Sequence, residues 1–295
     1  MTEHAPVPGL VNINGVITPI AEGRISVLDH GFLFGDNIYE TMRTYNQKPF
    51  LFTRHFERLQ KSARAVFLDL PLTREALYAE TLRTIHAAGN SSEHRLRITI
   101  TRGPGDDMSP DPESCDAPNT IVFVTPLQPL APSVYDKGVD VIISTFYRSR
   151  QLGDAKTGNL LRSVLALREA RAAGAFEAIT LTSEGKISDG ITANIYLIQG
   201  STVRTPSAES GILEGITRGV VLDLARRAGL SVVEAVLDLN EIEKAQELFL
   251  TSSTRGVVPI VRVSGKPVGT GQPGPITRQL MGAYRNELDA LLRED

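Results

Sequence analysis

The sequence predicts a mixed α/β protein with two domains, and three observations support this prediction. The chain has 295 residues, which is enough for two domains of ordinary size. In both halves, segments with strand-like alternation are mixed with segments of helical spacing. Between the halves, the proline-rich run from Pro126 to Pro132 stiffens the chain and lacks backbone donors. We therefore expect a small N-terminal α/β domain (1–126), a linker (127–133) and a larger C-terminal domain (134–295).

The N-terminal domain is predicted to begin with a β-hairpin. Two short apolar runs within residues 10–17 flank an Asn-Gly pair that suits a tight turn. A second strand pair is expected at Ile38–Tyr45 and Lys48–Phe52, around a turn at residues 46–47. The other elements expected here are two helices and two strands, at Thr53–Ala65, Thr73–Ala88, Leu96–Thr101 and Ile121–Thr125.

The C-terminal domain is predicted to contain further strands and helices in one mixed arrangement. Short apolar runs indicate strands, and longer segments with apolar residues three or four positions apart indicate helices. The strands are expected at Val139–Ser144, Ala178–Thr182, Asn194–Ile198 and Glu247–Thr251, with the second and third paired. The helices are expected at Asn159–Ala173, Thr217–Ala228 and Pro275–Leu292.

Composition argues against several classes of function. A net charge of -3 and a pI near 6.0 give no basic surplus for nucleic acid. Cys115 is the only cysteine and has no basic neighbour, so disulfides, Cys-rich zinc sites and a catalytic thiol are not expected. The five histidines are scattered, so no metal site is expected. Without a membrane-spanning apolar run or a signal-like N-terminus, we expect a cytoplasmic protein.

Four separated parts of the sequence contain the residues suited to catalysis, and their combination is informative. They are FGDNIYETMR (34–43) with HFERL (55–59), AKTGNLL (155–161), ISDGITANIY (187–196) with ILEGITR (212–218), and FLTSSTRGVVPI (249–260). In this order and spacing they resemble the class IV aminotransferases, the fold-type IV pyridoxal-phosphate enzymes. The likeness runs from about residue 10 to residue 285. It implies a two-domain fold-type IV structure whose larger domain has a mixed, barrel-like sheet.

The resemblance implies a catalytic role for Lys156. In the family, the lysine of this motif forms a Schiff base with pyridoxal 5'-phosphate and then moves a proton between the substrate Cα and the cofactor C4′. Most lysines are simply solvated, and only the surrounding motif favours the functional interpretation here. Lys156 is therefore the predicted catalytic residue.

The acid expected beside the cofactor ring nitrogen departs from the family pattern. The family has Glu followed by Gly, four residues before Asn; here Asp189 takes that place, with Gly190 and Asn194 in register. Because Asp is one methylene shorter, the ring or the strand must shift by about an ångström, or a water must intervene. Glu184-Gly185 lies five residues too early and is interpreted as a hairpin turn.

The cofactor phosphate is expected at the start of a helix. Gly215, Ile216 and Thr217 open that helix, where free backbone N–H groups and the helix dipole favour an anion. Capping by Thr217 is compatible with the same role. Arg58 would add a permanent positive charge, although without the motif it would pass for the exposed face of an amphipathic helix.

Further cofactor and substrate contacts follow from the resemblance alone. Ser252, Ser253 and Thr254 correspond to the segment that binds the phosphate and the substrate α-carboxylate. Glu177 corresponds to a glutamate near the phenolic oxygen of the cofactor.

Substrate choice is less clear from the sequence. The loop at residues 104–113 is acidic and lacks the Arg-x-His pair of D-amino-acid aminotransferases, and Thr217-Arg218 points away from aminodeoxychorismate lyase. Branched-chain enzymes have an aromatic residue where Tyr39 stands and a Tyr-x-Arg pair that Arg97 only half completes. Arg43, Arg97 or Arg255 is a candidate for a second carboxylate, against the alternative of an external salt bridge.

The sequence thus predicts a pyridoxal-phosphate-dependent aminotransferase. It would transfer an amino group between an amino acid, with branched-chain L-amino acids favoured, and a 2-oxo acid such as 2-oxoglutarate. The alternatives are a D-amino-acid or (R)-amine transaminase, aminodeoxychorismate lyase, or a non-transaminating pyridoxal-phosphate protein in which Asp189 marks the loss of activity. The expected partners are small-molecule amino donors and 2-oxo acids, without nucleic acid or membrane, and the family resemblance implies a homodimer.

Overall fold

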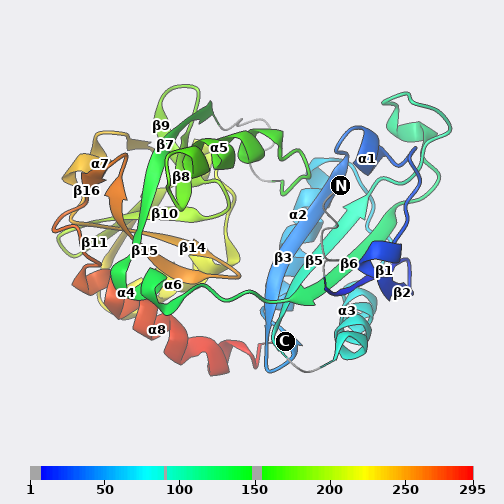
Figure 1. Ribbon diagram of the computed structural model, residues 1–295, viewed down its shortest axis with the longest axis horizontal. Coiled ribbons are helices and arrows are strands. Elements are labelled where there is room, and N and C mark those ends of the chain that lie inside the picture. Colours follow the sequence, from blue (N-terminus) through cyan, green and yellow to red (C-terminus); the bar gives the residue numbers. More distant parts are fainter. Residues whose placement is uncertain (1–7, 90–91, 148–154, 295) are drawn as a thin grey trace. The chain divides into compact units, whose positions relative to one another are not determined.

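The computed structural model describes residues 8–89, 92–147 and 155–294, which form two compact units (Figure 1). Of the described residues, unit 1 contains 8–89, 92–128, 155–159 and 290–294. Unit 2 contains 129–147 and 160–289. The segment with Lys156, which the sequence division assigned to the second domain, thus packs with unit 1.

Unit 1 is built on an antiparallel sheet of six strands in the order β2-β1-β6-β5-β3-β4. Helices α2 and α3 pack on one face of this sheet (Figure 1). The core between them consists of apolar side chains such as Ile38, Met42, Phe56 and Leu96. The elements are β1 (Leu10–Ile13), β2 (Val16–Pro19), α1 (His30–Leu33), β3 (Asn37–Tyr45), β4 (Lys48–Pro49), α2 (Phe52–Ala65), α3 (Arg74–Ala88), β5 (His94–Thr101) and β6 (Asn119–Pro126), with short 3-10 turns at Ile20–Glu22 and Pro112–Ser114.

The local predictions for this unit are largely confirmed, with one correction. The hairpin β1–β2 forms as predicted, and the turn at residues 46–47 has two left-handed residues, as tight hairpins require. The predicted strand Lys48–Phe52 is wrong beyond Pro49. Leu51 adopts a left-handed conformation with φ 54°, and α2 begins at Phe52. The chain turns here because Phe52 and Phe56 lie at helical spacing and are buried together in the core.

Unit 2 is built on a mixed sheet of ten strands that forms a nearly closed barrel. Its main path is β12-β11-β10-β14-β15-β7-β8-β9-β13, and β16 pairs with β15. The strands are β7 (Val139–Tyr147), β8 (Glu177–Leu181), β9 (Lys186–Gly190), β10 (Asn194–Gln199), β11 (Thr202–Pro206), β12 (Ser231–Ala235), β13 (Leu237–Asp238), β14 (Glu247–Ser252), β15 (Gly256–Val263) and β16 (Lys266–Pro267). The helices are α4 (Pro132–Lys137), α5 (Leu161–Ala172), α6 (Ile216–Arg227), α7 (Glu241–Lys244) and α8 (Pro275–Leu291), with a 3-10 turn at Ala208–Ser210.

One strand pairing predicted for this unit is wrong. The sequence paired the segments that form β8 and β10, but β8 pairs with β7 and β9, and β10 pairs with β11 and β14. An apolar run identifies a buried strand without identifying its neighbour. The turn predicted at Glu184-Gly185 is confirmed, because it joins β8 to β9 and Gly185 has a φ of 75°. Helix α5 begins at Leu161, two residues later than predicted.

The described part of the chain contains no helix that is both long enough and apolar enough to cross a membrane. Within the same residues, no group of three or more His, Cys, Asp or Glu side chains is arranged to bind a metal ion.

The barrel core predicts a clear stability effect. Leu197 on β10 is fully buried in the core of unit 2. Leu197→Ala should lower the free energy of unfolding of this unit by about 2–5 kcal/mol, because the truncation removes buried apolar area and leaves a cavity. Val236→Ala, at a position 38% exposed, is the control and should change it by less than about 0.5 kcal/mol. Equal effects of the two substitutions in urea titrations would contradict the assigned core.

Candidate active site

The backbone of Lys156 is attached to unit 1 from two sides. Its carbonyl oxygen accepts a hydrogen bond from the Tyr39 N–H (2.9 Å), and the Gly158 N–H donates to the Asn37 carbonyl (2.9 Å). Residues 155–159 therefore lie alongside β3 and are hydrogen-bonded to it through the backbone. On the other side, the Lys156 N–H donates to the Ser62 hydroxyl of α2 (3.0 Å). The start of the lysine side chain is fixed by both elements.

The Lys156 side chain shares an aromatic neighbour with an arginine. Its Nζ lies 4.7 Å from the centre of the Tyr39 ring, and the Arg97 Cζ lies 3.8 Å from the same centre. Both are cation–π distances. The Arg97 Nε also donates to the Thr99 hydroxyl (3.2 Å). Burial lowers the pKa of Arg97, Tyr39 opposes this shift and the charge of Arg95 adds to it, yet a guanidinium remains charged at neutral pH.

Arg58 belongs to a buried cluster with Glu40 and His55. The Arg58 Nε donates to Glu40 Oε1 (2.8 Å), and its Nη2 donates to Glu40 Oε2 (2.6 Å), which is a forked ion pair. The His55 Nδ1 lies 2.7 Å from Glu40 Oε2. All three side chains are buried, so the interpretation of Arg58 as an exposed helix residue is wrong.

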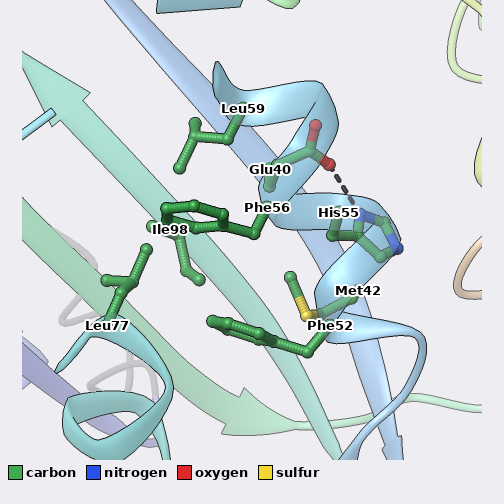
Figure 2. Close-up of a pocket in the computed structure, with 8 residues that line it drawn as sticks. All are labelled: Glu40, Met42, Phe52, His55, Phe56, Leu59, Leu77 and Ile98. Carbon is green, nitrogen blue, oxygen red and sulfur yellow. Dashed lines mark hydrogen bonds and ion pairs between the residues drawn. The ribbon is translucent and has the colours of Figure 1, made fainter. Parts of the chain in front are cut away.

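The surroundings of this cluster determine its protonation. Figure 2 shows Glu40 and His55 beside a pocket that has no room for a water molecule; the other lining residues are Met42, Phe52, Phe56, Leu59, Leu77 and Ile98. Burial alone would raise the pKa of Glu40, but the charge of Arg58 and the hydrogen bonds from Arg58 and His55 hold that pKa well below its usual range. Burial lowers the pKa of His55, against the opposing effect of Glu40. Because an ionised carboxylate only accepts, neutral His55 must carry its proton on Nδ1.

Two elements bring these groups together, and the sequence analysis missed part of the arrangement. His55, Arg58 and Ser62 lie three and four residues apart on α2, hence on one side of the helix. Glu40 occupies the buried face of β3, between Ile38 and Met42. Glu40, His55 and Ser62 were not predicted as site residues. The signal that could have identified Glu40 is a charged residue at a core position of an alternating strand.

In unit 2, the predicted ring-binding acid is anchored at both oxygens. Asp189 is 2% exposed at the end of β9. Its Oδ1 accepts from the Asn194 Nδ2 (3.0 Å), and its Oδ2 accepts from the Leu213 N–H (3.0 Å). The Asn194 Nδ2 also donates to the Leu213 carbonyl (2.7 Å). The carboxylate therefore has a defined orientation in the folded unit.

The predicted phosphate-binding residues open helix α6 as expected. Gly215 is the N-cap and supplies no side-chain cap, so the following N–H groups depend on other acceptors. A Cβ at Gly215 would lie 2.0 Å from the Asn194 Oδ1, so the position requires glycine as long as Asn194 keeps its place. Ile216 and Thr217 form the first turn, and Thr217 is buried. The helix start is thus suited to an anion and lies next to the partner of Asp189.

The segment from Ser252 to Arg255 forms the turn between β14 and β15 and contains Ser253 and Thr254. The Arg255 Nε donates to the Ser252 hydroxyl (2.9 Å), and its Nη1 lies 3.1 Å from Glu177 Oε2. Arg255 and Glu177 therefore both have polar partners within the protein.

The region at residues 191–192 also contributes to this network. The Arg255 Nη2 donates to the Thr192 hydroxyl (2.7 Å), and Glu177 Oε1 accepts from the Ile191 N–H (3.0 Å). Arg255 and Glu177 therefore support the turn and the loop after β9. This network gives both residues a structural position, while the ligand roles predicted for them stay predictions.

Comparison with known proteins identifies the family. Residues 37–263 match the family model described as amino-transferase class IV. The chain belongs to this family. It is therefore a class IV aminotransferase, a pyridoxal-phosphate-dependent transaminase with the mixed α/β fold of that group.

Relatives and solved structures agree over nearly the whole chain. This aminotransferase is 32% identical to a provisionally named branched-chain-amino-acid aminotransferase of Methanocaldococcus jannaschii (94% of this chain, 95% of that one). It is 31% identical to a D-alanine aminotransferase of Bacillus licheniformis (94% and 96%). The structure of the Escherichia coli branched-chain amino acid aminotransferase superposes with a TM-score of 0.89 at 26% identity (95% and 94%).

The residues present fit the cofactor that the family uses. Each unit, taken by itself, contains groups of the kinds that a phosphorylated pyridine requires. Unit 2 has a buried carboxylate with fixed orientation and a helix that starts at glycine, and unit 1 has a buried arginine. Lys156 presents its amine beside an aromatic ring.

The Glu40 cluster predicts an acid-sensitive unit 1. Glu40→Gln should lower its free energy of unfolding by about 3–5 kcal/mol, because the buried guanidinium of Arg58 loses the carboxylate of its forked ion pair. In the wild type, the lowered pKa of His55 and the lowered pKa of Glu40 both make the protein less stable in acid. The stability that neutral His55 contributes is lost as pH falls below its ordinary pKa of 6.5, and the stability that ionised Glu40 contributes is lost as pH falls below 4.5.

Urea titrations across this pH range test the prediction. The Glu40→Gln curve should be flatter below pH 4.5, since the titrating carboxylate is gone. Glu75→Gln removes an exposed carboxylate and serves as the matched control. A wild-type stability that rises on acidification would refute the assigned protonation states.

Proposed function

We propose that Lys156 is the residue that carries pyridoxal phosphate and moves the proton during transamination. When bound, the cofactor supplies an electron sink for the negative charge that develops at the substrate Cα. Once the substrate amine has displaced it from the cofactor, the Lys156 Nζ would be free to take the proton from the substrate Cα and to hold it for delivery to the cofactor C4′. The fixed backbone of Lys156, hydrogen-bonded to Tyr39 and Ser62, supports this role because it limits where the amine can move.

The phosphate is proposed to bind at Gly215, Ile216 and Thr217, with Arg58 as the cation and Ser252 and Ser253 as further donors. The N–H groups at the start of α6 and a buried guanidinium suit a dianion. Glu40 restrains that guanidinium through two hydrogen bonds.

Asp189 is proposed to keep the cofactor ring nitrogen protonated, with Asn194 orienting it. The anchoring of both carboxylate oxygens supports a fixed acceptor. The same two hydrogen bonds also limit how far Asp189 can reach toward the ring. Because Asp is one methylene shorter than the Glu usual in the family, the cofactor would have to lie correspondingly closer to it. Glu177 is proposed to act on the phenolic side through the loop that contains Thr192.

For the reaction, we propose amino transfer from a branched-chain L-amino acid to 2-oxoglutarate. Relatives and structures with this named activity, including one solved with a phosphopyridoxyl-L-glutamate, support it. Tyr39 and Arg97 would contact the substrate, and Thr254 with Ser253 its α-carboxylate. The second candidate is a D-amino-acid transaminase, because several relatives of similar identity are D-alanine aminotransferases.

A labelling experiment tests the role of Lys156. After borohydride reduction, the wild-type peptide that contains Lys156 should carry the cofactor mass, and Lys156→Ala should carry none and lose at least about 100-fold in activity. Lys137→Ala, at an exposed lysine, is the control and should match the wild type. Label on any other lysine would refute the assignment.

The same holoenzyme distinguishes the substrates. Single-turnover reactions with L-leucine, D-alanine and (R)-1-phenylethylamine should show L-leucine fastest. Faster reaction with D-alanine or the amine would replace the proposed donor by that alternative, and silence with every amino donor would contradict transamination.

We also propose a cytoplasmic homodimer, and the location stays a prediction. Four apolar side chains within residues 25–34 are substantially exposed: Ile25 (42%), Val27 (71%), Phe32 (66%) and Phe34 (38%). Exposed apolar groups concentrated in one segment favour a protein contact. A second copy of the chain is the partner that the family resemblance implies.

Light scattering coupled to gel filtration tests the dimer. The expected mass is twice the chain mass of 32.1 kDa. Phe32→Asp should shift the protein toward monomer, because it buries a charge in the contact. Phe67→Asp, at an isolated phenylalanine that is 90% exposed, should leave the mass unchanged. A monomeric wild type would overturn the proposal.

A further inference from the structure

The turn between β1 and β2 contains the only Asn-Gly pair of the sequence, Asn14-Gly15. Both residues are exposed, and both have a left-handed backbone conformation, with φ 50° and φ 89°. Because glycine has no side chain, its backbone nitrogen can closely approach the side-chain amide of the preceding asparagine. The pair is therefore suited to an intramolecular reaction at Asn14.

This reaction needs no reagent other than water. The Gly15 nitrogen attacks the Asn14 Cγ, so that an N–Cγ bond forms and the Cγ–Nδ2 bond breaks. Ammonia leaves with the proton of the attacking N–H. Water then opens the cyclic imide, and aspartate or isoaspartate replaces the asparagine. The conversion adds one negative charge, and the loss of ammonia makes it irreversible.

The attacking nitrogen is restrained by a buried side chain. The Gly15 N–H donates to the Asn12 Oδ1 (2.8 Å), and Asn12 is 2% exposed. The Asn12 Nδ2 in turn donates to Glu80 Oε2 (2.7 Å) and to the Thr84 hydroxyl (3.0 Å), so the acceptor is fixed to α3. The Gly15 N–H must give up its proton to react, and this hydrogen bond keeps solvent base away from it.

The amide under attack is also held in place. The Asn14 Oδ1 accepts from the Thr120 N–H (2.8 Å), and the Asn14 Nδ2 donates to the Asn119 Oδ1 (2.7 Å). The Asn14 N–H donates to the Thr120 carbonyl (2.9 Å). Ring closure therefore requires the turn to separate from the start of β6.

The product would not fit the same hydrogen bonds. The Asn119 Nδ2 donates to Asp29 Oδ2 (2.6 Å), and Asp29 is fully buried and caps α1 through the Gly31 N–H (2.7 Å). A carboxylate in place of the Asn14 amide has no donor for the Asn119 Oδ1. If the Asn119 amide rotates to donate to it, Asp29 loses that donor. One hydrogen bond is lost in either case.

We propose that Asn14 is a site of spontaneous deamidation and that Asn12 restrains the reaction in the folded protein. The fraction converted then records how often the β1–β2 turn has opened, because the reaction cannot reverse. The conversion weakens the attachment of this turn to β6 and the cap of α1. It is independent of the reaction that the enzyme catalyses.

Peptide mapping of the holoenzyme by mass spectrometry tests the restraint. In mildly alkaline buffer, Asn12→Ala should convert Asn14 about tenfold faster than the wild type, since the Gly15 N–H loses its acceptor. The wild type unfolded in urea should also convert faster than the folded wild type. Circular dichroism verifies that Asn12→Ala is folded during the incubation.

Two controls separate the restraint from general instability. Leu77→Ala removes a buried side chain of α3 and keeps the Asn12–Gly15 hydrogen bond, so it should accelerate the conversion far less than Asn12→Ala. Asn46, in the other left-handed turn, is followed by Gln47, whose side chain hinders ring closure, and should stay intact in the same digests. Equal rates in the wild type and Asn12→Ala would overturn the restraint. An Asn14 that stays intact in urea would overturn the site.

Asn14→Asp imitates one product and tests its consequence. The substitution should lower the melting temperature of the holoenzyme by about 2–5 °C, because one hydrogen bond is lost. Asn240→Asp adds the same charge at an exposed residue without a side-chain cap bond and should leave the melting temperature unchanged. An unchanged melting temperature in Asn14→Asp would refute the proposed weakening.

Discussion

The buried carboxylate of Glu40 is the constraint on which the architecture of unit 1 depends. It lies on a strand, and both of its partners, His55 and Arg58, lie on helix α2, so the ion pair couples the sheet to the helix in a dry environment. Because the Ser62 hydroxyl of the same helix accepts a hydrogen bond from the Lys156 N–H, the position of the lysine depends on the position of α2. A buried carboxylate destabilises the fold unless both of its oxygens accept hydrogen bonds, and this penalty favours the one arrangement of β3 and α2 in which they do.

Unit 2 uses the same principle in another form. Asp189 is buried at a strand end and takes hydrogen bonds from a side-chain amide and from a backbone N–H, and the amide belongs to Asn194. Asn194 in turn excludes any side chain at Gly215, so the acid and the helix start are positioned by one residue. Both units therefore place charged groups by burying them beside obligatory partners.

Local sequence patterns predicted much of the fold. The alternation of β3, the two helices of unit 1 and the turns at residues 46–47 and 184–185 follow from periodicity and turn chemistry. The prediction of a strand up to Phe52 was wrong because Leu51 adopts a left-handed conformation and α2 begins at Phe52. The apolar residues that follow Leu51 pack into the core from this helix. Strand partners in unit 2 failed for a different reason. An apolar run indicates that a segment is buried, but the strand with which it pairs depends on how the whole sheet closes.

The sequence by itself determined the family and the cofactor class and predicted most of the candidate site residues, because Lys156, Asp189 and the Gly-Ile-Thr start of α6 occur in motifs of fixed spacing. Only the tertiary structure decided which partners these groups have. It joined Glu40 to Arg58, Ser62 to Lys156 and Arg43 to Arg95 across sequence separations that no local pattern encodes. The physical reason is that motif spacing records chemistry along the chain, whereas burial, ion pairing and strand register are properties of segments that meet only after folding.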